Sequence, residues 1–230
     1  REMTGAGMMD CKKALTETNG DMDAAVDVLK KSGAAKMEKK QSRIAAEGIA
    51  RVAVNGNVAV VAEVNSETDF VAKNETFQEF VQTVADTALA SDLNGGANGE
   101  DIEALLATNG LSDLLVEKTA TIGEKLSVRR FAKVTGDAVA SYIHGGGRIG
   151  VVIAADGASD DAAKEALTNI AMQVAAMNPQ YISRNDISAE ELAKIKEITI
   201  DSALNDATTL PKPILNKLLD KAIGEKVWSD

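Results

Sequence analysis

The apolar positions of this chain change from a helical spacing to a strand-like spacing near Gly48. Apolar side chains alternate or run together through residues 49–54 and 58–64, on either side of Asn55-Gly56. Asn-Gly between two such runs is a strong signal for a β-hairpin, because both residues tolerate the positive φ angles of a tight turn. The sequence therefore predicts two antiparallel strands joined at Asn55-Gly56.

A helix is predicted directly after this hairpin. Thr76-Phe77-Gln78-Glu79 matches a capping box, which would start the helix. Apolar residues then recur at helical spacing and form one stripe, comprising Phe77, Phe80, Val81, Val84, Ala85 and Ala88. Residues 100–122 predict one or two more helices, and residues 126–134 predict a further strand.

The same succession of elements occurs a second time. Residues 138–144 and 148–154 predict strands joined by Gly145-Gly146-Gly147, and a helix is expected over about residues 160–177. At offsets of 91 and 90 residues the apolar positions of the two parts correspond: Val58, Val60 and Val61 with Ile149, Val151 and Val152, and Phe77, Phe80 and Val84 with Leu167, Ile170 and Val174. We interpret this as a duplicated core, each copy a hairpin and a packed helix.

The N-terminal residues have the pattern of a small helical module. Residues 1–34 predict three short helices, broken at Gly5-Ala6-Gly7 and Asn19-Gly20-Asp21 and closed by Ser32-Gly33. The buried face of the middle helix is expected to carry Cys11. Residues 35–47 predict a charged linker or an exposed helix.

The C-terminal residues return to a helical pattern. Residues 186–224 predict a helical hairpin, because Pro211 and Pro213 interrupt the pattern before a second helix. The chain begins at Arg1 without an initiator methionine and ends just after Trp228, so we expect both ends to be truncated. The predicted fold class is α+β, with units at residues 1–34, 35–47, 48–135, 136–185, 186–224 and 225–230.

Composition and charge narrow the possible partners. The chain is 45% apolar and 26% charged, as in ordinary globular proteins, and its aromatic content of 3% implies an aliphatic core. We expect a cytoplasmic protein, because no apolar run spans a membrane, no signal peptide is visible and one cysteine cannot form an internal disulfide. The net charge of −10 argues against nucleic-acid binding, although residues 1–43 carry +2 and could still touch RNA.

No motif for metal binding, nucleotide binding or catalysis is convincing. One histidine, His144, and one cysteine, Cys11, cannot supply a zinc site, and no Ser-His-Asp arrangement is evident. Residues 145–150 spell G-x-G-x-x-G, but a dinucleotide-binding motif joins a strand to a helix, whereas this one joins two predicted strands. No P-loop occurs. We therefore expect no cofactor, no directly bound nucleotide and no enzymatic activity.

The remaining candidates are residues suited to contact with another protein. Met8 and Met9 point about 100° apart on a helix, so both cannot face the core well, although partial burial of both is an equal alternative. His144 is expected on an exposed turn. Phe70 lies in a polar connection, where it either extends the stripe of Phe77 or contacts a partner, and the pattern leaves both possibilities open.

Three stretches of the sequence resemble signatures of bacterial elongation factor Ts. They are Thr4–Leu15, Glu63–Asn74, and Tyr142–Gly145 together with Arg148–Gly150. The resemblance runs from Arg1 to about Val227 in the order of the family. The opening helix of the family is mostly absent before Arg1, and the closing segment that completes its second core copy is missing beyond Trp228.

This resemblance implies a guanine-nucleotide exchange factor for the GTPase elongation factor Tu. Residues 1–34 would form a ubiquitin-associated-like (UBA-like) module that docks on the GTPase, and residues 186–224 would form a protruding coiled coil. The family's contact positions are matched by Arg1, Met8, Met9 and His144. The segment that the family inserts near the Mg²⁺ site of its partner is matched by Thr68, Asp69, Phe70 and Val71, of which Asp69 and Phe70 would form a wedge.

Two other classes of protein stay open. A non-catalytic adaptor would use the UBA-like module for binding alone, but the intact Asp69 and Phe70 argue against it. A small-molecule enzyme would need a converging set of polar residues, which the sequence does not offer. In the second core copy Asp156–Asp161 stands where the first has Asn65–Phe70, so only the first copy is expected to carry the wedge.

Overall fold

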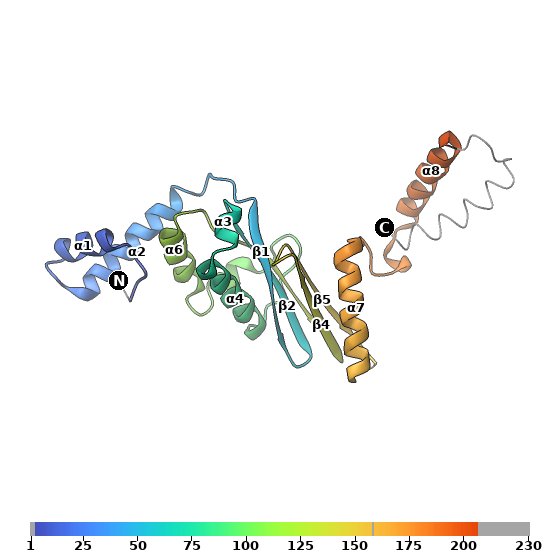
Figure 1. Cartoon of the computed structure of the whole chain (residues 1–230), viewed down its shortest axis with the longest axis horizontal. Coiled ribbons are helices and arrows are strands. Elements are labelled where there is room, and N and C mark those ends of the chain that lie inside the picture. The colour runs from blue at the N-terminus through green and yellow to red at the C-terminus, as the bar shows by residue number, and fades with distance from the viewer. Residues whose placement is uncertain (1–2, 158, 207–230) are drawn as a thin grey trace. The chain divides into compact units, whose positions relative to one another are not determined.

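The computed structural model of the protein describes residues 3–157 and 159–206 and divides the chain into two compact units, Arg1–Ala175 and Ala176–Asp230. Helices and antiparallel strands are mixed throughout the first unit, which confirms the predicted α+β class (Figure 1). Its elements are α1 (Met8–Glu17), α2 (Met22–Glu38), β1 (Glu47–Asn55), β2 (Val58–Ser66), α3 (Asp69–Ala72), α4 (Glu75–Ala90), α5 (Ile102–Leu106), α6 (Leu111–Ile122), β3 (Ser127–Thr135), β4 (Ala138–His144), β5 (Ile149–Ala155) and most of α7 (Asp161–Met177).

The first sheet has the strand order β1-β2-β3, with both pairs antiparallel. The predicted hairpin is confirmed, since Asn55 pairs with Val58 and Gly56 has a φ of +60°, which a glycine adopts without strain. A β-bulge interrupts the pairing of β2 with β3 between Glu63 and Val64. Such bulges bend a strand, and this one lies close to the end of β2 from which the α3 segment leaves.

The main core lies between one face of this sheet and α4. The predicted stripe of α4 is confirmed, because all six of its residues are buried, with Phe77 fully enclosed and Phe80 only 1% exposed. They share one core with residues of the sheet, such as Ile49, Val60 and Val64, and with residues of α5 and α6. Removing these side chains from water is the dominant stabilising contribution to this unit.

The start of α4 differs from the predicted capping box. Asn74 is the N-cap, and its side-chain oxygen accepts a hydrogen bond from the Phe77 backbone N–H at 3.2 Å. Thr76 therefore lies within the first turn. Asparagine caps helices at least as well as threonine, and the backbone N–H of Asn74 is already held by the Val71 carbonyl at the end of α3.

The second sheet consists of β4 and β5 among the described residues and packs on the other face of the first sheet. Gly150 marks the closest approach, since a Cβ atom there would stand 2.9 Å from both Ala50 Cβ and Val61 Cγ2. The Gly147 carbonyl also accepts a hydrogen bond from the Ala50 N–H at 2.7 Å. Glycine is thus required where two backbones meet closely.

The helix α7 covers the outer face of the second sheet, so the layers run α4, first sheet, second sheet, α7 (Figure 1). Leu167 packs there with Ala138, Ala140 and the partly buried Ile153. The G-x-G-x-x-G stretch forms the turn between β4 and β5, as predicted. The hairpin and helix recur in the predicted order, and the duplication itself stays a prediction.

In the N-terminal part the structure describes two helices. Asp21 caps α2 by accepting a hydrogen bond from the Ala24 N–H at 3.0 Å, which confirms the predicted turn. The predicted end of this helix at Ser32-Gly33 is wrong, because α2 continues to Glu38. Gly33 lies within the helix, where a Cβ atom would stand 3.1 Å from Val116 Cγ1 of α6, so close packing outweighs its poor helix propensity.

Several predictions about the chain ends concern residues that are not described. The first predicted helix falls on residues 1–4, of which Met3 and Thr4 form a turn and residues 1–2 lie outside the description. In the second unit, α8 (Ala189–Asp206) follows a short 3₁₀ helix (Arg184–Asp186). The second arm of the predicted helical hairpin and residues 225–230 lie outside the described residues. Within the described parts no helix has the length and apolar character needed to cross a bilayer.

The contact at Gly150 yields a test of the packing between the sheets. Gly150→Ala is expected to lower the free energy of unfolding by about 1–3 kcal/mol, because its Cβ would overlap Ala50 and Val61. Gly7→Ala is the matched control, since only the Asp10 carboxylate approaches a Cβ there, at 3.6 Å. Urea denaturation of both variants measures the difference, and equal stabilities would show that the second sheet does not pack as described.

Candidate functional site

The predicted wedge lies on a one-turn helix between β2 and α4. Thr68 is the N-cap of α3, and its hydroxyl oxygen accepts a hydrogen bond from the Val71 N–H at 3.4 Å. Val71 and Ala72 turn inward onto the main core. We call Thr68–Val71 the α3 turn. It is short, but it is tied to the core at its C-terminal end.

Phe70 points away from the protein and is 80% exposed. Because Val71 and Ala72 occupy the inner side of the turn, the residue before them faces the solvent. The possibility that Phe70 extends the stripe of Phe77 is therefore wrong. The ring is therefore accessible to another molecule.

Asp69 lies beside Phe70 and pairs with Lys73 at 2.7 Å, one helical turn along. The hydrogen bond from Lys73 lowers the pKa of the Asp69 carboxyl, and the charge of Lys73 adds to this effect. Both side chains are exposed, so the pair contributes little to stability. The pair places a carboxylate and an ammonium group close to the exposed ring.

The backbone just before α3 is held by a residue that is distant in the sequence. Glu124, in the loop between α6 and β3, accepts hydrogen bonds from the backbone N–H groups of Glu67 and Thr68, both at 3.0 Å. Its other oxygen accepts the hydroxyl hydrogen of Thr68 at 2.6 Å. All three bonds go to an ionised carboxylate, which makes them stronger than bonds between neutral groups.

A second carboxylate completes this network. Glu67 accepts a hydrogen bond from the Lys125 N–H at 2.6 Å and pairs with Arg43 at 3.2 Å. The backbone hydrogen bond from Lys125 is the main cause that lowers the pKa of the Glu67 carboxyl, while partial burial opposes it. The Lys125 ammonium in turn donates to the carbonyls of Gln41 and Arg43, at 2.6 and 2.9 Å. Three separate segments thus meet at the base of the α3 turn.

Sequence reasoning did not identify Glu124, Glu67, Arg43 or Lys125. A helix C-cap signal at Gly123 marks the end of α6, since its φ is +88°, but nothing nearby indicates that the next two residues reach Glu67 and Thr68. Such a contact joins positions almost sixty residues apart and has no local pattern.

The other predicted contact residues lie on separate elements. Met8 and Met9 are 68% and 73% exposed on α1, so the alternative in which both are partly buried is wrong. His144 is exposed at the end of β4, as predicted, and shares a hydrogen bond with the Tyr142 hydroxyl at 3.0 Å. Arg1 lies outside the described residues. The roles of these residues as contacts stay predictions.

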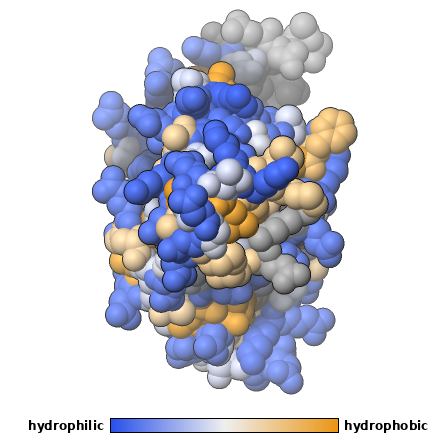
Figure 2. All heavy atoms as spheres, turned by 90° about the vertical axis from the view of Figure 1, so that its left-hand side faces the viewer, coloured by the Kyte–Doolittle hydropathy of each residue, from blue (hydrophilic) through white to orange (hydrophobic). Residues whose placement is uncertain are grey.

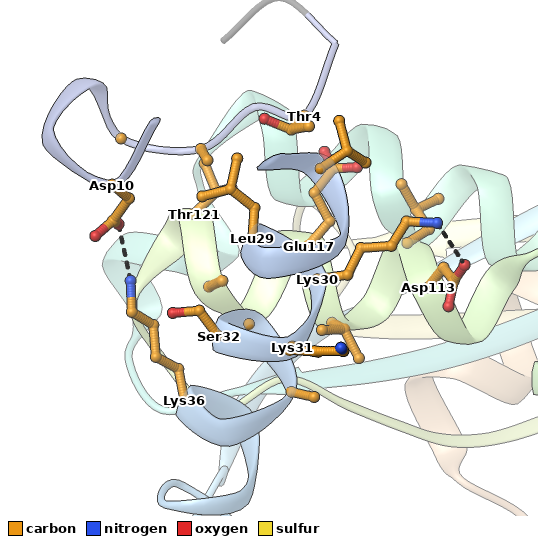
Figure 3. Close-up of a pocket in the computed structure, with 18 of the residues that line it drawn as sticks. Thr4, Asp10, Leu29, Lys30, Lys31, Ser32, Lys36, Asp113, Glu117 and Thr121 are labelled. Carbon is orange, nitrogen blue, oxygen red and sulfur yellow. Dashed lines mark hydrogen bonds and ion pairs between the residues drawn. The ribbon is translucent and has the colours of Figure 1, made fainter. Parts of the chain in front are cut away.

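A hollow of about 590 Å³ lies between residues 3–10, α2 and α6, apart from the α3 turn (Figure 3). Two pairs of its charged residues form ion pairs, Lys36 with Asp10 at 2.8 Å and Lys30 with Asp113 at 3.6 Å. Apolar side chains such as Leu29 form much of its wall. The hydroxyl of Thr4, which also lines the hollow, is buried without a hydrogen-bond partner among the described residues.

The surface around the N-terminal helices is mostly hydrophilic, with small separate hydrophobic areas (Figure 2). Exposed methionines at positions 3, 8, 9 and 22 contribute apolar side chains in this part of the chain. Within residues 3–157 and 159–206, no group of three or more His, Cys, Asp or Glu side chains could hold a metal ion.

A comparison with models of known protein families finds a match. The family model described as elongation factor TS matches residues 67–227. The match begins at Glu67, so it contains the α3 turn and His144, together with Glu124. It does not include α1 with Met8 and Met9.

The lowered pKa of Glu67 predicts a specific dependence of stability on pH. A carboxyl whose pKa is lowered by folding adds stability above its unfolded pKa, about 4.3, and loses it as the pH falls through the lowered folded value. The difference in stability between the wild type and Glu67→Gln should therefore be constant above about pH 5 and shrink in more acidic solution. Thermal unfolding from pH 7 to pH 3 measures it.

The control for this experiment is Glu79→Gln, at an exposed position of α4. If the stability difference for Glu79→Gln shrinks in acid as much as that for Glu67→Gln, the pH dependence does not come from the network at the α3 turn.

Proposed function

Since the chain belongs to the elongation factor Ts family, we propose that it releases GDP from elongation factor Tu by inserting Asp69 and Phe70 as a wedge beside the Mg²⁺ and phosphate site. The family implies nucleotide exchange in translation elongation. The observation that carries the finer proposal is the ring of Phe70, 80% exposed on an ordered turn.

A wedge of this kind acts on the contacts that hold GDP most firmly. A GTPase binds GDP largely through phosphate–amide contacts and through a Mg²⁺ ion that offsets the phosphate charge. A side chain that displaces the segment organising this site weakens both without touching the base. The carboxylate of Asp69 would add electrostatic repulsion against the phosphates.

The exposed ring supplies the free energy for the displacement. Burying a phenylalanine side chain contributes about 2–3 kcal/mol. The ring can gain this only where the site of the partner has opened, so it shifts the equilibrium toward the open state by about 30- to 150-fold. A ring packed in its own core could not supply this energy, and that is why the exposure of Phe70 supports the proposal.

Reciprocity then completes the cycle. If the exchange factor weakens GDP binding, GDP weakens binding of the exchange factor by the same factor. The same holds for GTP, so rebinding of abundant GTP ejects the exchange factor. The chain would make and break no covalent bond and bind no nucleotide or cofactor itself, and it would act in the cytoplasm.

The remaining predicted features have places in the same proposal. The UBA-like module would dock on the GTPase through Arg1, Met8 and Met9, and the exposure of the two methionines supports this. His144 would add a contact from the second copy of a duplicated core. Residues 186–224 would form the coiled coil, of which α8 is the described helix.

The rival proposal is a non-catalytic adaptor that binds through the UBA-like module alone. The exposed Met8 and Met9 would serve an adaptor equally well. The two proposals differ in the need for the wedge, because an adaptor without exchange activity gains nothing from Phe70. Release of labelled GDP from elongation factor Tu, with and without this protein, separates them.

Phe70→Ala is expected to slow stimulated GDP release by at least about tenfold, because the variant loses the burial energy of the ring. Its free energy of unfolding should change by less than about 0.5 kcal/mol, since the ring is 80% exposed. Phe77→Ala is the matched control and should lose about 3–5 kcal/mol of stability, because Phe77 is fully buried. Wild-type protein that fails to accelerate release would contradict the proposal.

Asp69→Ala is expected to slow GDP release while leaving the midpoint of thermal unfolding almost unchanged, because the pair with Lys73 is exposed. Lys73→Ala is the control, since it breaks the same pair but keeps the carboxylate. Equal loss of exchange in both variants would mean that the ion pair, and not the negative charge of Asp69, is what matters.

A further inference from the structure

The backbone of the α3 turn sets the place from which the side chain of Phe70 leaves the surface. Its side chain is 80% exposed. A wedge must nevertheless enter its partner in one orientation, and misplacement by about 1 Å can cost on the order of a hundredfold in rate. The question is therefore what fixes the backbone of the α3 turn.

The turn cannot fix itself. The helix α3 has four residues, and helices of this length are unstable in isolation because the first turn fixes many dihedral angles for one hydrogen bond. At its C-terminal end, Val71 and Ala72 pack on the core. At its N-terminal end the backbone N–H groups of Glu67 and Thr68 both point to the carboxylate of Glu124.

Glu124 also determines how Thr68 caps the helix. The hydroxyl of Thr68 donates its hydrogen to Glu124 at 2.6 Å, so the lone pairs of the same oxygen face the Val71 N–H. A hydroxyl has one hydrogen, and an acceptor that takes it leaves the oxygen free to cap the helix. The three hydrogen bonds of Glu124 therefore fix both the position of the turn and the direction of its cap.

Glu124 itself rests on fixed backbone at both sides. On one side Gly123 ends α6 with a φ of +88°, and its carbonyl accepts a hydrogen bond from the Lys40 ammonium at 2.5 Å. On the other side the Lys125 N–H donates a hydrogen bond to the Glu67 carboxylate, and Leu126 is buried in the main core with 3% of its surface exposed. The carboxylate is thus carried by a loop that cannot shift without breaking these contacts.

We propose that Glu124 is the positioning residue of the wedge. It acts through the α3 turn and holds Phe70 in the orientation that enters the partner, without touching the nucleotide site. This inference rests on the proposed function. It predicts that Glu124 governs the rate at which elongation factor Tu, once bound to this protein, releases GDP. The docking contacts at Met8, Met9 and His144 should be unaffected.

The test compares Glu124→Ala with Glu124→Gln in the GDP-release assay over a range of concentrations of this protein. Glu124→Ala should lower the rate at saturation by about tenfold or more, because several charge-assisted hydrogen bonds are lost. The concentration giving half the maximal rate should change by less than about threefold. Glu124→Gln should recover part of the rate, since its amide oxygen can still accept from the Glu67 and Thr68 N–H groups, whereas its NH₂ group cannot accept the Thr68 hydroxyl hydrogen.

A double-mutant cycle with Phe70→Ala tests whether Glu124 affects the GDP-release rate through Phe70 or only through the stability of the fold. If Glu124 acts through Phe70, adding Glu124→Ala to Phe70→Ala should change the rate by less than about twofold. Glu63→Ala is the matched control: it removes a partly buried glutamate paired with Arg130 at 2.6 Å on the first sheet. Its effect should be small and should multiply with that of Phe70→Ala.

The outcomes separate this inference from the proposed function. If Phe70→Ala slows release but Glu124→Ala does not, or if their effects multiply, Glu124 is not the positioning residue. If Phe70→Ala has no effect, the proposed function itself fails. If Glu124→Ala does not fold, Glu124→Gln and Glu124→Asp are compared instead. Higher activity in Glu124→Gln than in Glu124→Asp, whose side chain is shorter, supports the inference. Equal activities of the two variants overturn it.

Discussion

The packing of α4 on the first sheet is the interaction on which the rest of the first unit depends. An isolated helix of this length is marginally stable in water, and the apolar face of the sheet would be exposed to water without the helix. Together they enclose the ring of Phe77 completely and that of Phe80 almost completely. The helix α3 is separated from α4 by only Lys73 and Asn74, and the second hairpin lies on the opposite face of the first sheet. Both therefore take their positions from this one core.

Local patterns sufficed to predict the elements of this core but not the contacts that hold the candidate site. The hairpin at Asn55-Gly56 and the α4 stripe follow from turn chemistry and periodicity, which are properties of neighbouring residues. The pattern did not predict the end of α2, because Gly33 packs against Val116 of α6. It also did not predict the hydrogen bonds from Glu67 and Thr68 to Glu124. Each depends on residues far apart in the sequence. For Phe70, the pattern left both a core position and an exposed position open. The structure decides for the exposed position, because Val71 and Ala72 occupy the inner side of the turn.

The two hairpin–helix parts use the connection before their helices differently. In the first part this connection carries an outward aromatic ring. In the second, the Asp160 carboxylate accepts a hydrogen bond from the Ala163 N–H at 2.8 Å, and Asp137 holds the Gly157 N–H at 2.8 Å. The helices differ as well, since Ile170 is 49% exposed where Phe80 of the first part is buried. In the second connection the Asp160 carboxylate and the Gly157 N–H thus make hydrogen bonds within the chain, whereas the first connection carries a ring that is 80% exposed.

The glycine turn between β4 and β5 has a consequence for association between molecules. β1 is an edge strand of the first sheet, and exposed edge strands invite pairing with strands of other chains. The outward N–H of Ala50 in β1 donates a hydrogen bond to the Gly147 carbonyl, so it is not available to another strand. A side chain at Gly147 would collide with Ile49. The turn therefore blocks this edge near its start and protects the sheet from edge-to-edge aggregation.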